Sequence, residues 1–92
     1  MNYATLASAV LGLMEHHPYI ITDNPTTDTA YDAACNLNRA LDLLPDALPC
    51  RAFATPGNTF FVIRVSEIAE NIDLLETHCD KRHLQDIQQF AS

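Results

Sequence analysis

The sequence predicts a small α+β domain in which a two-stranded antiparallel hairpin packs against three or four helices. Apolar residues recur at intervals of three and four in both halves of the chain, which is typical of helices with one buried face. Between these halves, two runs of β-prone residues flank Pro56, Gly57 and Asn58, a sequence that favours a hairpin turn. The 92 residues, 48% of them hydrophobic, suffice for one core. We therefore expect a single domain over residues 1–92, in the order helix, helix, strand, strand, helix and, after a break, helix.

The first predicted helix follows Asn2, a residue suited to the N-cap position. His16 and His17 would lie in its last turn, where positive charge complements the helix dipole, and Pro18 cannot continue the helix. We therefore expect the helix to end near His17. Its buried stripe consists of Leu6, Ala9, Val10, Leu13 and Met14.

Residues 19–27 are interpreted as a connection between the first two helices. The run over residues 19–22 is compatible with a short strand or an extended linker, and residues 23–27 have loop-forming chemistry. A second helix should begin near Thr27 or Asp28 and end before Pro45. Its apolar stripe consists of Tyr31, Ala34, Leu37, Leu41 and Leu44.

The hairpin is expected over residues 50–65, after a helical turn or plain loop at residues 46–48. Alternation along the first strand places small residues on one face, whereas the second strand carries bulky residues on both faces. This asymmetry suggests that one face packs on the helices, while Phe60 and Val62 on the other face are only partly covered. A two-stranded ribbon is marginal alone, so the edge strand of a second copy is a candidate for completing it.

A third helix is expected to start at Ser66 as N-cap, with Glu67 in its first turn. Its apolar stripe cannot continue in phase to the end of the chain, so we expect a break between Thr77 and Arg82. Thr77 and Asp80 have capping-box spacing and would start a fourth helix that reaches about residue 90. The stripe of the third helix consists of Ile68, Ile72, Leu75 and Cys79.

Charge and cysteine content narrow the possible partners and compartment. Twelve acidic residues face five basic ones, giving a formal net charge of −7, so nucleic acid and anionic membranes would be repelled. A basic protein surface is the electrostatically favourable partner. Three cysteines without a CxxC motif indicate reduced thiols and a cytoplasmic protein. The apolar residues 4–14 have no preceding Lys or Arg, so we interpret them as a helix, and no stretch is long enough for a membrane span.

The main candidate surface is a row of acidic residues spaced three apart, Glu67, Glu70, Asp73 and Glu76. On a helix, such a row presents a charge about every 5 Å, not far from the spacing of phosphates along a nucleic-acid strand. The alternative interpretation is the ordinary solvated face of an amphipathic helix. The predicted partner-binding residues are the members of this acidic row together with Phe60 and Val62.

Metal binding and catalysis have weaker support. Cys79 and His83 lie four residues apart and His78 is adjacent, but a structural zinc site needs four ligands. His16, His17, Cys35 and Cys50 show no chelating spacing. Two glycines in 92 residues offer little material for an oxyanion hole. We therefore predict no catalytic residues, no metal and no cofactor.

The leading hypothesis is a non-enzymatic acidic inhibitor that docks on a basic surface of a nucleic-acid-handling protein, with a possible role as a nucleic-acid mimic. In size and charge the chain is similar to small inhibitors of nucleases and of CRISPR effectors (anti-CRISPR proteins) and to immunity proteins. The alternative is a homodimer or larger homo-oligomer, a structural or adaptor module that pairs through the hairpin edge. A small Cys/His metal-binding protein or thiol enzyme is the third hypothesis.

Overall fold

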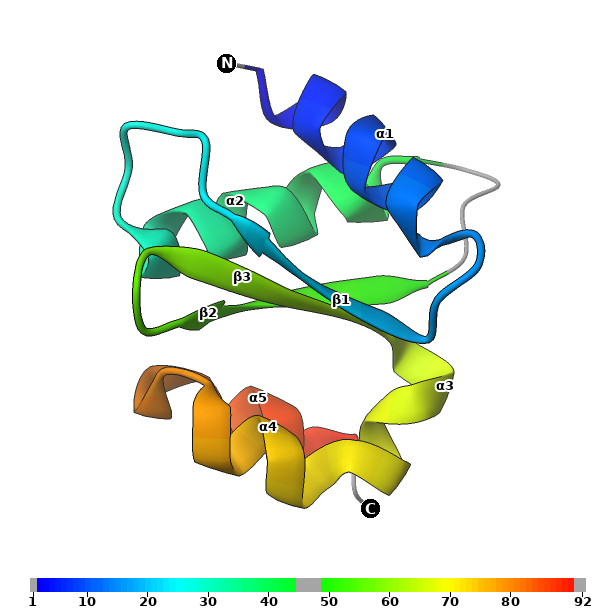
Figure 1. The fold of residues 1–92 in the computed structure, drawn as a ribbon, viewed down its shortest axis with the longest axis vertical. Coiled ribbons are helices and arrows are strands. Elements are labelled where there is room, and N and C mark those ends of the chain that lie inside the picture. The colour runs from blue at the N-terminus through cyan, green and yellow to red at the C-terminus, as the bar shows by residue number, and fades with distance from the viewer. Residues whose placement is uncertain (1, 45–48, 91–92) are drawn as a thin grey trace.

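The computed structural model describes residues 2–44 and 49–90 of the chain, so the turn expected at residues 46–48 lies outside the described residues. It has three layers, with a central sheet covered by helices on both faces (Figure 1). Helices α1 (Tyr3–Met14) and α2 (Ala30–Asp42) cover one face, and the C-terminal helices cover the other. The predicted α+β class is confirmed, and the chain forms one small domain.

The sheet has three antiparallel strands in the order β1-β3-β2, rather than the two of the predicted hairpin. The hairpin strands are β2 (Cys50–Thr55) and β3 (Thr59–Arg64), and Gly57 and Asn58 turn the chain at φ values of 87° and 59°. The third strand is β1 (Tyr19–Asp23), which was interpreted as part of a connection. Strand β3, which has bulky residues on both faces, is the central strand. It pairs with β2 along one edge and with β1 along the other.

Helix α1 begins as predicted and ends earlier than predicted. The Asn2 side chain accepts a hydrogen bond from the Ala4 backbone N–H at 2.7 Å, which confirms the N-cap. The helix ends at Met14 rather than near His17. Its last carbonyls are bound by Arg64 of β3, whose guanidinium donates to the carbonyl oxygens of Met14 at 2.8 Å and Glu15 at 3.1 Å. A cation from another element therefore occupies the position that the histidines were expected to take.

Helix α2 begins at Ala30 with Thr29 as its N-cap, later than the expected Thr27 or Asp28. The preceding loop is held by the buried side chain of Asn24. Its amide donates to the Asp28 carbonyl and to the Asn58 side chain, each at 2.9 Å. These bonds keep residues 24–28 in a loop next to the hairpin turn, so the helix starts only after them.

The C-terminal half contains short helical segments, and the predicted break is confirmed. The chain leaves α4 at His78 and enters a 3-10 turn at Lys81. Both predicted N-caps are wrong: the first helix of this half starts at Val65, before Ser66, and the Thr77 hydroxyl donates to the Asp73 carbonyl instead of capping. The segments are α3 (Val65–Ile68), η1 (Ala69–Asn71), α4 (Ile72–His78), η2 (Lys81–His83) and α5 (Leu84–Gln89).

The sheet separates two hydrophobic clusters. On the α1 and α2 side, the small residues Ala52 and Ala54 of β2 allow α2 to lie close, and Phe60 and Val62 are fully buried there. The expectation that Phe60 and Val62 are only partly covered is therefore wrong, because a second layer of helices packs on their face. The cluster on the other side consists of Phe53, Phe61, Ile63, Ile68, Leu75, Cys79 and Ile87.

The outer edge of β2 is closed by groups from both helical layers. The Ala52 N–H donates to the Asn38 Oδ1 atom at 2.7 Å, and the Asn38 Nδ2 atom donates to the Ala52 carbonyl at 3.0 Å. Two residues along, the Ala54 N–H donates to His83 Nε2 at 3.0 Å, and the Ala54 carbonyl accepts from the Asp80 N–H at 2.8 Å. At these positions the hairpin edge offers a second copy no free backbone groups.

Replacing Asn38 with alanine is expected to lower the free energy of unfolding by about 1–2 kcal/mol, because both of its bonds to Ala52 are lost in a partly buried setting. Urea unfolding followed by circular dichroism measures the change. The matched control is Asn36→Ala on the same helix, whose Oδ1 accepts only an exposed bond from Arg39. Equal losses for the two variants would contradict a specific role in closing the edge.

Candidate functional site

The acidic row follows the outside of the C-terminal helical layer. Glu67 lies on α3, Glu70 on η1, and Asp73 and Glu76 on α4; Glu67 is half-buried and the other three are exposed. The row spans three consecutive helical segments, one of them a 3-10 turn, so its members do not share one regular helix.

The row is not neutralised by the basic residues. In the part of the chain that the structure describes, two ion pairs occur, Arg51 with Asp42 at 2.8 Å and Arg82 with Asp80 at 2.7 Å. Neither includes a member of the row, and Arg64 is engaged by the end of α1. The negative charge of the row is therefore open to an external cation.

A second feature adjoins the row, the outer edge of β1. Two backbone hydrogen bonds flank this strand, from the Arg64 N–H to the Pro18 carbonyl at 3.1 Å and from the Asn24 N–H to the Asn58 carbonyl at 3.0 Å. Between them, antiparallel pairing makes every second residue direct its N–H and C=O groups away from β3. Within the described ranges, no hydrogen bond from another residue reaches these outward groups. They belong to Tyr19, Ile21 and Asp23.

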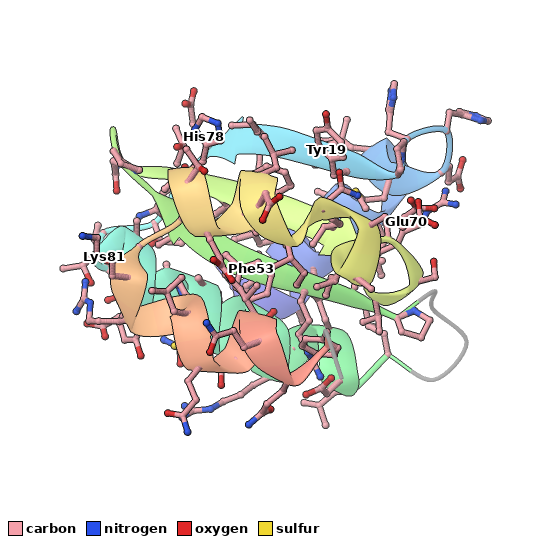
Figure 2. All side chains as sticks on the ribbon, turned by 90° about the horizontal axis from the view of Figure 1, so that it is seen from below. Tyr19, Phe53, Glu70, His78 and Lys81 are labelled. Atoms are coloured by element: carbon pink, nitrogen blue, oxygen red, sulfur yellow. The ribbon has the colours of Figure 1, made fainter. Side chains whose placement is uncertain are left out.

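An apolar groove of about 400 Å³ lies along this edge, between β1 and α4. The C-terminal helices pack mainly on the side chains of β2 and β3, which leaves β1 partly uncovered. Ile21 is 62% exposed, and Tyr19 is 38% exposed with its ring stacked on Phe61 at 4.9 Å. Figure 2 shows Tyr19 between His78 and Glu70 along this side of the molecule. The groove is lined by Tyr19, Ile21, Thr55, Pro56, Thr59, Phe61, Leu74, Thr77 and His78.

The structure changes the membership of the candidate surface. Phe60 and Val62 cannot contact a partner in the folded protein because neither is exposed. Their place is taken by Tyr19 and Ile21, which the sequence analysis had left in a connection. The sequence signal for a strand here is the β-prone run Tyr-Ile-Ile-Thr, and the alternating exposure of Tyr19 and Ile21 with Ile20 appears only in the folded strand.

The buried His83 of η2 lies at the outer edge of β2, where it also contacts Tyr31 of α2. His83 accepts the Ala54 N–H through Nε2, and its ring lies 4.8 Å from Tyr31 and 5.4 Å from Phe53. Burial lowers the pKa of His83 below its ordinary value, so the ring is neutral at pH 7. Because Nε2 must be an unprotonated acceptor for the Ala54 N–H, the neutral ring holds η2 to the edge of β2.

Arg82, the residue before His83, lies on the Tyr31 ring, with its guanidinium 4.0 Å from the ring centroid. Arg82 also donates to both carboxylate oxygens of Asp80, at 3.1 and 2.7 Å. These hydrogen bonds hold the pKa of Asp80 at about 2. Lys81, next to them, points outward at the same end of the molecule (Figure 2).

The Cys79 and His83 pair, weighed as zinc ligands from the sequence, is not set up for metal binding. His83 Nε2 is occupied by the Ala54 N–H, and burial raises the pKa of the Cys79 thiol to about 12. Burial also raises the pKa of Cys50, and a protonated thiol is neither a good ligand nor a good nucleophile. Among the described residues, no group of three or more His, Cys, Asp and Glu side chains is placed to hold a metal ion.

Comparison of the chain with models of protein families, with curated proteins and with solved structures finds no match. Within residues 2–44 and 49–90, no helix has the length and apolar character needed to cross a bilayer. The acidic row and the groove between β1 and α4 are the surface features of the described residues that bear on function.

Proposed function

We propose that this protein is a non-catalytic inhibitor that docks on the basic surface of a nucleic-acid-handling protein. The observation that supports this most is the row Glu67, Glu70, Asp73 and Glu76, which none of the ion pairs among the described residues neutralises. The formal net charge of −7 gives the whole molecule the same sign as a nucleic acid. Inhibitors of nucleases or of CRISPR effectors, and immunity proteins, are the classes that this chemistry fits.

The inhibition follows from competition for the same cations. Lys and Arg side chains that bind phosphates would pair with the carboxylates of the row, so nucleic acid and this protein could not occupy that surface together. Attraction between opposite net charges raises the association rate and weakens as salt screens it. The apolar groove between β1 and α4 adds contact area that does not depend on salt.

The test starts with affinity capture from the native host, with mass spectrometry to identify the bound proteins. Binding of each captured protein is then measured at 50 and 500 mM salt, on the order of the range over which surface charges become screened. We expect a nucleic-acid-binding partner whose affinity falls at least about tenfold at the higher salt. A duplex or single-stranded oligonucleotide should displace this protein from the partner.

Reversing two charges of the row, Glu70→Lys with Asp73→Lys, should weaken binding by about tenfold or more. The matched control is Glu15→Lys with Asp86→Lys, which changes the net charge equally at exposed sites outside the row. Circular dichroism checks that both double variants fold. A partner whose binding is indifferent to salt, to oligonucleotide and to the reversal of Glu70 and Asp73 would refute the proposed function.

A homo-oligomeric adaptor is the second candidate, and the exposed edge of β1 favours it. If two copies paired antiparallel through this strand, Ile21 would lie opposite Ile21 of the other copy, and Tyr19 opposite Asp23. Sedimentation at high protein concentration measures this self-association. A monomer at all concentrations would exclude the adaptor.

A further inference from the structure

The outer edge of β1 carries backbone groups that the described residues leave unpaired. Its outward N–H and C=O groups, at Tyr19, Ile21 and Asp23, have no partner among the described residues, whereas the β2 edge is closed at Ala52 and Ala54. The side chains of Tyr19, Ile21 and Asp23 are exposed, so nothing in the described chain blocks a strand from approaching. Exposed edges of this kind are used for recognition by strand addition.

The groove specifies where the added side chains would go. A strand paired with β1 directs every second side chain towards the α4 face, beside the residues opposite it. The side chain opposite Ile21 would enter the apolar groove between Ile21 and Leu74. That position therefore calls for a valine-like or isoleucine-like residue.

Charge specifies the flanking positions. Asp23 lies at one end of β1, and Glu70 lies beyond the Tyr19 end of the groove (Figure 2). A basic side chain opposite Tyr19 would lie beside an aromatic ring, at the end of the groove towards which Glu70 contributes negative charge. A basic side chain opposite Asp23 would meet a carboxylate directly.

We propose that β1 binds an extended segment of a basic partner protein as a fourth strand, antiparallel to β1, with a basic-x-apolar-x-basic pattern facing α4. This inference deepens the proposed function and rests on it. A second copy of this chain is the less favourable occupant, because its β1 carries no Lys or Arg and each copy has a formal net charge of −7. A basic segment brings the complementary charge and the same backbone hydrogen bonds.

The probe is a synthetic peptide with the sequence Thr-Lys-Thr-Val-Thr-Lys-Thr, blocked at both ends and labelled for fluorescence anisotropy. We expect binding at low salt, with the backbone amides of Tyr19, Ile21 and Asp23 becoming protected from hydrogen exchange measured by NMR. The Ala52 and Ala54 amides should not change, since they are already hydrogen-bonded.

Three modified peptides separate strand pairing from charge attraction. Methylation of the valine nitrogen, which would face β1, should weaken binding at least about tenfold, because it removes a hydrogen bond and blocks the approach of the strands. Methylation of a neighbouring threonine nitrogen, which faces away, should have little effect. A peptide with glutamate in place of both lysines should not bind.

On the protein, Ile21→Pro removes an outward N–H that no residue of 2–44 or 49–90 uses, so the edge strand should still fold. It should weaken peptide binding at least about tenfold, whereas Ile21→Val should not. Equal effects of the two methylations, protection confined to residues outside β1, or a homodimer formed through β1 would each overturn the inference.

The outcome also separates this inference from the function on which it rests. If a captured partner binds with salt dependence and with loss on reversal of Glu70 and Asp73, but Ile21→Pro binds it normally, the strand-addition inference fails alone. If neither salt nor charge reversal alters partner binding, the proposed function fails, and strand addition by a basic segment fails with it.

Discussion

Replacing Phe60 with alanine is expected to lower the free energy of unfolding by about 3–5 kcal/mol, the cost of emptying a buried aromatic site. Phe60 has no exposed surface and packs between β3 and the layer of α1 and α2. A domain of this size has a total stability of roughly 5–15 kcal/mol, so the loss is a large fraction of it. Urea or thermal unfolding followed by circular dichroism measures the effect.

An exposed apolar residue, Ile21, is the control that separates a core role from a contact role for Phe60. Ile21→Ala, at a position that is 62% exposed, should change the free energy of unfolding by about 0.5 kcal/mol or less. If instead Phe60→Ala left stability unchanged and weakened partner binding, Phe60 would be a contact residue, as its sequence context suggested. In the structure, Phe60 is a core residue and Ile21 is the one exposed to a partner.

The parts of the fold that depend on neighbours in the chain could be predicted from the sequence. Asn2 caps α1 through a bond to a residue two positions on, and Gly57 and Asn58 form the turn by their own tolerance of positive φ. The break after His78 follows from an apolar stripe that cannot stay in phase. Each of these signals is contained within a few residues.

The parts that depend on distant residues could not be predicted in this way. The five residues of β1 become a strand because β3 offers them a partner 40 positions away, as in the pairing of Ile21 with Phe61. The end of α1 is fixed by Arg64, and the start of α2 by bonds from Asn24 to Asn58 and to the intervening loop. Strand β3 has bulky side chains on both faces, and both sets are buried because helices cover each face of the sheet. The sequence of β3 alone does not show that both faces are covered.

The candidate site also has one part that nearby residues determine and one part that depends on distant residues. The exposure of Glu70, Asp73 and Glu76 follows from helical period, so the acidic row was found from the sequence. The groove is formed by residues of β1, β3 and α4, which are distant in the sequence, so no local sequence pattern predicts it. The sequence analysis therefore located the exposed acidic row, whose role in binding stays a prediction, and assigned the apolar part of the candidate site to buried residues.

Replacing His83 with leucine is expected to lower the free energy of unfolding at pH 7.5 by about 1–3 kcal/mol, because the Ala54 N–H loses its acceptor inside the protein. The packing against Tyr31 and Phe53 would also be altered. The control is His16→Leu, an exposed residue just after α1, for which little change is expected. Equal stability of the two variants would show that the bond to Ala54 contributes nothing.

The pH dependence of wild-type stability gives an independent test of the same bond. Burial lowers the pKa of His83 in the folded protein below the ordinary 6.5, although Asp80 and Asp86 oppose the shift and Arg82 adds to it. The unfolded chain therefore binds more protons below pH 6.5, and stability should fall as the pH drops from 6.5 towards the folded pKa. Asp80 adds a further loss only below its ordinary pKa of 3.8, as the pH approaches about 2.

Unfolding free energies measured between about pH 7.5 and pH 5 therefore isolate His83 from Asp80, since the two groups lose their contributions in separate windows. Wild type should lose stability across this range, and His83→Leu should lose less, because it has no imidazole there to protonate. Parallel pH profiles for the two proteins would mean that His83 already accepts a proton in the folded state. That result would be incompatible with an Nε2 atom that serves as the acceptor for β2.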